Sequence, residues 1–97
     1  MGNTMTGTAQ AETLVATIEA LWETVGMPGG IGQSWRDELM WQTGRLAGVL
    51  TIVHGSRYYG TEPVATIDEG LVAGWIMDAG QAMERARRNP FGDPAFD

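Results

Sequence analysis

The sequence predicts an all-α protein, a small three-helix bundle-like domain that is completed by self-association. Apolar residues recur at helical spacing in three segments, turn-forming residues separate those segments, and no long alternating run competes as a β-strand. With 97 residues the chain makes one domain. We expect a flexible lead over residues 1–8, the helical domain over residues 9–89 and a short tail over residues 90–97.

The first helix is expected to end before Gly26, because the following Pro28 and glycines do not continue a helix. Its apolar positions are Leu14, Val15, Ile18, Leu21, Trp22 and Val25. Residues 26–33 then form a glycine-rich loop that precedes a helix, as phosphate-binding loops do. The loop has no lysine and no preceding strand, so we interpret it as a connection between helices, with an anion site as the alternative.

The second helix is predicted from about Trp35 to His54, with Ser34 as its N-cap. It carries two apolar stripes. The first stripe contains Trp35, Leu39, Leu46, Leu50 and Val53, and the second contains Trp41, Gly44, Gly48, Ile52 and Gly55. A helix that is apolar on two sides is usually covered on two sides, so we expect it to be the central element.

The third helix is predicted from about Ile67 to Arg88. Thr66 and Glu69 match a capping box at its start, and Asn89 and Pro90 end it. Three arginines lie in its last turns, where they complement the helix dipole; a nucleic-acid contact is the less favoured interpretation. The apolar stripe of this helix contains Val72, Ile76, Ala79, Met83 and Ala86.

Two pairs of glycines stand four residues apart inside the helical segments: Gly44 with Gly48, and Gly70 with Gly74. Each glycine inside a helix costs about 1 kcal/mol relative to alanine. We therefore expect these positions to allow close helix packing, with the bulky Trp41 or Trp75 over a glycine groove. The contact is either a crossing within one chain or a contact between two copies.

A candidate ligand-binding site follows the second helix. His54, Arg57, Tyr58 and Tyr59 bring an imidazole, a guanidinium and two phenols together on an expected loop. Arginine can grip a phosphate, and tyrosine can stack on a base. In the alternative interpretation the histidine interacts with the helix dipole and the tyrosines pack on the bundle.

One charged residue interrupts the apolar third helix. Asp78 lies between Met77 and Ala79, and a buried aspartate needs a partner. We expect Arg45 of the second helix to be that partner in a structural pair. A site residue is the alternative role of Asp78.

The composition excludes several classes of function. With no cysteine and a single histidine, the chain cannot form a thiolate or multi-histidine metal site by itself. We find no nucleophile–base pair or cofactor fingerprint and expect no enzyme activity, cofactor or metal. A net charge of −6 is unfavourable for binding duplex nucleic acid. The chain lacks a run of roughly 20 apolar residues and a signal peptide, so we expect no membrane contact and a cytoplasmic location.

These observations favour a small helical protein–protein interaction module, an adaptor or an inhibitor. It would oligomerise and present an apolar surface rich in aromatic residues and methionine. Its basic residues are all arginines, which suits a bacterial or phage gene. The alternative is a protein that binds a small anionic ligand, such as a nucleotide signal, at a subunit interface. The expected partners are a second copy, a protein partner or such a ligand.

Overall fold

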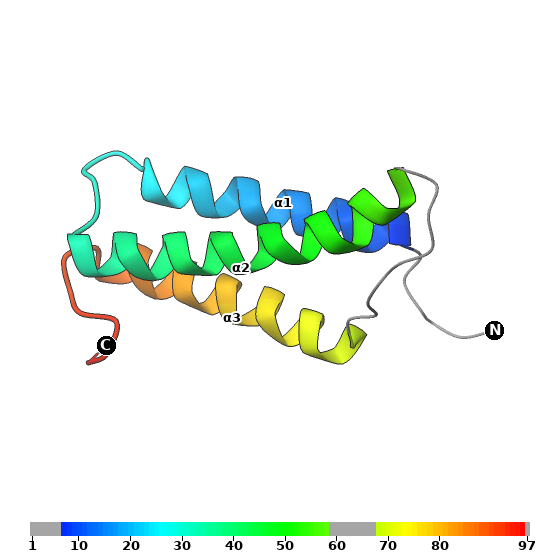
Figure 1. The fold of residues 1–97 in the computed structure, drawn as a ribbon. Coiled ribbons are helices and arrows are strands. Elements are labelled where there is room, and N and C mark those ends of the chain that lie inside the picture. The colour runs from blue at the N-terminus through cyan, green and yellow to red at the C-terminus, as the bar shows by residue number, and fades with distance from the viewer. Residues whose placement is uncertain (1–6, 59–67, 97) are drawn as a thin grey trace.

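Three helices form the whole fold of the described chain, which confirms the predicted all-α class. The computed structural model describes the backbone of residues 7–58 and 68–96 and the side chains of residues 10–52 and 68–96. The helices are α1 (Gly7–Val25), α2 (Gln33–Tyr58) and α3 (Glu69–Arg88). They pack against one another, and α2 runs opposite in direction to α1 and α3 (Figure 1).

Helix α3 begins later than the capping box predicts. Its N-cap is Asp68, whose side chain accepts a hydrogen bond from the backbone N–H of Leu71 at 3.0 Å. The predicted cap, Thr66, lies outside the described residues. An aspartate cap satisfies one of the free N–H groups of the first turn, and its charge also favours that end of the helix dipole.

Helices α1 and α2 are longer than their sequence patterns predict. Helix α1 begins at Gly7 instead of residue 9. Helix α2 begins at Gln33, because the Gly32 carbonyl already accepts from the Arg36 N–H at 3.0 Å. Ser34 therefore lies inside the first turn and is not the N-cap. Helix α2 also continues to Tyr58, four residues beyond the predicted end at His54.

The connection between α1 and α2 and the C-terminal tail meet at one end of the bundle. Gly29 and Gly30 have φ angles of +88° and +74°, which side chains disfavour, so the chain reverses tightly there. The Gly32 N–H donates to the Pro90 carbonyl at 2.8 Å. Arg85 donates to the Pro94 carbonyl at 2.6 Å. The tail is thus docked beside the start of α2 (Figure 1).

The core lies along the first predicted stripe of α2. Trp35, Leu39 and Leu46 are fully buried, as the helical spacing predicts. Helix α1 buries two leucines in this core, and α3 buries mainly alanines, with Trp75, Ile76 and Met83 packed against them. The buried residues of these two helices are Ala11, Leu14, Leu21 and Thr24 in α1, and Val72, Ala79, Ala82 and Ala86 in α3.

The paired glycines do not mediate close packing within the chain. A Cβ atom added to Gly44, Gly48 or Gly74 would meet nothing within 4 Å, and one added to Gly70 would meet only the Asp68 cap at 3.0 Å. All four glycines are exposed. The expectation of an intramolecular crossing at these positions is wrong, because the alanines of α3 face the core instead. A contact with a second copy stays a prediction.

Two glycines outside the predicted pairs test the backbone geometry. Gly80 is helical with open space at its Cβ position, whereas Gly30 has a positive φ. We predict that Gly80→Ala raises the free energy of unfolding by about 0.5–1 kcal/mol and that Gly30→Ala lowers it by about 1 kcal/mol. Thermal unfolding of both variants checks this, since 1 kcal/mol corresponds to about 4–8 °C in a domain of this size. Equal effects of both substitutions would contradict the helix and turn geometry.

Candidate interaction surface

The most organised side-chain cluster outside the core is built around Arg45. Its guanidinium carbon lies 4.5 Å from the ring centroid of Trp41 and 4.8 Å from that of Trp75. Both distances are within the range of cation–π attraction. Trp41 stands one turn before Arg45 on α2, and Trp75 reaches it from α3. The arginine therefore joins two indole rings from different helices.

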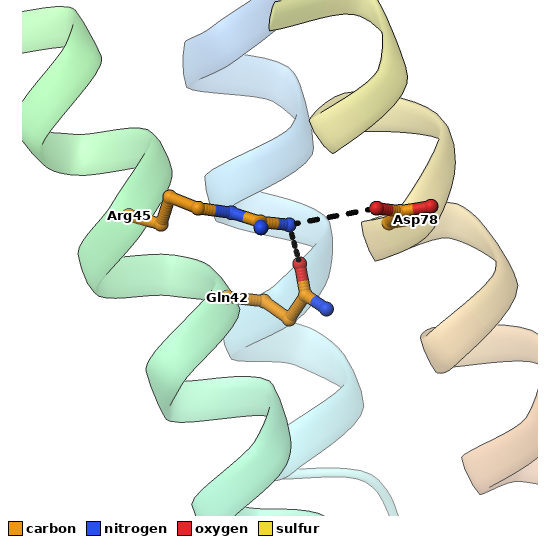
Figure 2. A network of polar contacts seen from close by, with 3 residues as sticks. All are labelled: Gln42, Arg45 and Asp78. Atoms are coloured by element: carbon orange, nitrogen blue, oxygen red, sulfur yellow. Dashed lines mark hydrogen bonds and ion pairs between the residues drawn. The ribbon is translucent and has the colours of Figure 1, made fainter. Parts of the chain in front are cut away.

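Polar contacts fix the same guanidinium group. Figure 2 shows Arg45 reaching from α2 towards α3, with Gln42 and Asp78 on one of its nitrogens. Arg45 Nη2 donates to Gln42 Oε1 at 2.8 Å and lies 3.8 Å from Asp78 Oδ2. The predicted Arg45–Asp78 pair is confirmed. The expected burial of Asp78 is wrong, because its side chain is 57% exposed while that of Arg45 is 18% exposed.

The cluster belongs to a larger surface that we call the α2–α3 face. Helical spacing places Gly48 about one turn and Ile52 about two turns beyond Arg45 on the same side of α2. It likewise places Leu71 and Gly74 before Trp75 and Asp78. The face is defined by Glu38, Trp41, Gly44, Arg45, Gly48 and Ile52 of α2 and by Leu71, Gly74, Trp75, Asp78 and Arg85 of α3. A hollow of about 360 Å³ between Trp41 and Arg85 opens on it.

This face combines exposed apolar side chains with charged groups of both signs. Trp41 is 57% exposed, Leu71 48% and Ile52 41%. The face carries two carboxylates, Glu38 and Asp78, and two guanidinium groups, Arg45 and Arg85, and the exposed Asp37 lies one turn before Trp41 on the same side of α2. Aromatic residues and arginine are enriched in protein–protein interfaces.

The second stripe of α2 thus has a different environment from the one expected. The sequence predicts that both sides of α2 are covered, but Trp41, Gly44 and Gly48 are exposed. Trp41 and Trp75 contact Arg45, not a glycine groove. The methionines are divided: Met27 and Met83 pack against the core, and Met40 and Met77 are exposed. Neither exposed methionine belongs to the α2–α3 face, whose aromatic residues are Trp41 and Trp75.

The structure leaves the predicted ligand site untested. The backbone of His54, Arg57 and Tyr58 forms the last turns of α2, where a loop was expected. Their side chains lie outside the described part of the molecule, as does all of Tyr59. Their role in binding an anion remains a prediction.

Two of the three arginines at the end of α3 make contacts within the fold. Arg85 stacks on the ring of Trp35 at 5.3 Å and also holds the tail. Arg87 donates to the buried Thr24 hydroxyl at 3.1 Å, which joins α3 to α1. The sequence gives no indication of this contact, because threonine on a helix is usually a surface residue. Among the described side chains, no group of three or more acidic or histidine residues could hold a metal ion.

The chain matches no known family model, no curated protein and no solved structure. In the part of the chain that the structure describes, no helix has the length and apolar character needed to cross a membrane. The assignment of function therefore rests on the geometry of the α2–α3 face.

Substitutions in the Arg45 cluster separate its ring contacts from its ion pair. Arg45→Met keeps the apolar stem and removes two cation–π contacts, so it should lower the free energy of unfolding by about 1–2 kcal/mol. Asp78→Asn should lower it by less than about 0.5 kcal/mol, because the carboxylate is exposed and screened by solvent. Urea unfolding of the dilute monomer measures both values. An equal loss in the two variants would show that the carboxylate, not the rings, holds the arginine.

Proposed function

We propose that this protein is a small helical interaction module that associates with itself and binds protein partners through the α2–α3 face. The observation that carries the proposal is the exposed Trp41 ring, against which Arg45 packs at 4.5 Å on the α2–α3 face. Aromatic side chains at such positions supply much of the binding energy of protein interfaces.

The fixed position of Trp41 favours binding over incidental exposure. A side chain that is already ordered loses little conformational entropy when a partner covers it. Arg45 contacts both Trp41 and Trp75, so two aromatic residues of the face are ordered before any partner arrives. The cluster thus resembles the preorganised anchor of a binding surface more than a loose apolar residue in water.

Other exposed apolar residues of the described chain lack this organisation. Trp22 of α1 is 52% exposed, but no cation–π contact involves it among the described residues. Phe91 and Phe96 of the tail are 72% and 88% exposed, and among the described residues no cation–π contact involves either ring. We therefore assign the interaction to the α2–α3 face, and Trp22 serves as its natural control.

Light scattering after size-exclusion chromatography, over a wide range of protein concentration, tests the proposal. The natural protein should form a defined oligomer. Trp41→Ser should weaken the association by about 30-fold, the effect of losing an anchor worth about 2 kcal/mol. Trp22→Ser removes an equally exposed indole from α1 and should change the association by no more than about twofold.

Two outcomes would count against this function. A protein that stays monomeric at every concentration has no self-association to explain. A melting temperature that rises with added nucleotide would favour the alternative ligand-binding function, because a ligand that binds only the folded state stabilises it. In that case Arg57→Ala should abolish the rise.

A further inference from the structure

A groove opens between α1 and α3, and no described residue of α2 lines it. It has two connected parts of about 430 and 490 Å³, which share Ala20, Gly80 and Met83. Ala16 and Ile76 extend this apolar lining. We call it the α1–α3 groove. A hollow of this size is large enough to receive an aromatic side chain.

The two ends of the α1–α3 groove differ in charge. Glu12 lines it near the start of α1, and Glu84, Arg87 and Arg88 line it near the end of α3. Arg87 is held there by its hydrogen bond to the Thr24 hydroxyl at 3.1 Å. The Arg88 side chain makes no ion pair or hydrogen bond with the described residues. The α3 end is therefore basic on a chain of net charge −6.

The C-terminal tail consists of two successive β-turns. The Gly92 N–H donates to the Asn89 carbonyl and the Phe96 N–H donates to the Asp93 carbonyl, both at 3.0 Å. Asp93 Oδ1 also accepts from the Ala95 N–H at 2.9 Å. Both turns start with an asparagine or aspartate that proline follows, which is a favoured turn sequence. The tail backbone is thus ordered before any partner binds.

The two phenylalanines of the tail have different environments. Phe91 packs beside Gly32, because a Cβ atom added to that glycine would lie 3.7 Å from the Phe91 Cδ1 atom. Together with the hydrogen bond from Gly32 to Pro90, this contact docks the tail. Phe96 is 88% exposed, so its ring contributes little to the fold. A phenyl ring that is exposed on an ordered backbone gains free energy when a partner buries it.

The surroundings of Phe96 are acidic. The segment that precedes it lines a hollow together with Asp37 and Glu38 of α2, and Asp93 belongs to that segment. The cation beside this segment is Arg85, which already donates to a tail carbonyl. Carboxylates therefore outnumber guanidinium groups around the tail.

The acidic tail and the basic end of the α1–α3 groove complement each other, but they lie apart within one chain. The tail lies against the start of α2, whereas α1 and α3 line the groove. A second copy offers the same groove to this tail, with an apolar hollow for the ring and guanidinium groups for the carboxylates. Because every copy carries both parts, charge complementarity indicates a second copy as the occupant.

We propose that the Phe96 ring of one copy enters the basic end of the α1–α3 groove of a second copy, where Arg88 faces the carboxylates around the tail. This contact rests on the proposed self-association and adds a second surface to it. It uses neither Trp41 nor Trp75, so the two surfaces can be tested separately.

Nuclear magnetic resonance of methionine methyl groups tests the contact, because Met83 lines both parts of the groove. One protein carries isotope-labelled methionine and Phe96→Ser, so its groove is intact and its own tail has no ring to insert. Unlabelled natural protein is then added. A phenyl ring placed against Met83 should shift the signal of its methyl group. In the matched control the added protein also carries Phe96→Ser.

The expected result is a Met83 shift that grows to a limit with added natural protein and is absent with the Phe96→Ser protein. An equal shift with both additions would overturn the role of the ring. Association in light scattering without a Met83 shift would overturn this contact and leave the proposed function intact. Protein that stays monomeric throughout would overturn both. A Met83 shift in a protein whose association ignores Trp41→Ser would support this contact and contradict the α2–α3 face.

A pair of charge reversals tests the basic end of the groove. Arg88→Glu in the labelled protein should weaken the binding of natural protein, read from the Met83 shift, by about fivefold. Arg36→Glu changes the net charge equally at an exposed position of α2 outside the groove. It should weaken the binding by no more than about twofold. Equal weakening by both variants would overturn Arg88 as the group that faces the tail. Circular dichroism verifies that both variants keep their helices.

Discussion

A helix in a three-helix bundle has two neighbours, and they cover only part of its circumference. This constraint decides how α2 is used. Its first stripe, with Trp35, Leu39 and Leu46, is fully buried between α1 and α3. Its second stripe, with Trp41, Gly44 and Gly48, is covered by no further helix within the described chain. The core and the candidate interaction surface are therefore two sides of the same helix, because its two neighbouring helices cover only one of them.

Arg45 connects these two sides. It stands beside the buried stripe, and it holds Trp41 and Trp75 at the surface by contacts of 4.5 and 4.8 Å. The guanidinium group is flat and weakly hydrated, so it can stack on two rings and still donate to Gln42. A lysine would lack this flat surface. The result is an aromatic surface that is ordered without being buried, which is the condition that a binding anchor requires.

Close helix packing in this molecule comes from alanine. Ala79, Ala82 and Ala86 of α3 face the core, and they leave room for the larger side chains of α1 and α2. The glycines, which have even less bulk, lie on the outside. A Cβ atom added to Gly44, Gly48 or Gly74 would meet nothing within 4 Å. Two kinds of small residue therefore lie on two different surfaces, alanine towards the core and the paired glycines towards the outside.

The sequence alone determined the three helices, because apolar periodicity and helix-ending residues are local properties of the chain. It also indicated the Arg45–Asp78 pair, since an aspartate inside an apolar helix requires a partner. The tertiary structure decided which stripe of α2 faces inward, that Asp78 is exposed, and that Arg87 reaches Thr24. These features depend on where the neighbouring helices lie around α2. Periodicity shows that a helix has two apolar sides, but only packing shows which side remains uncovered.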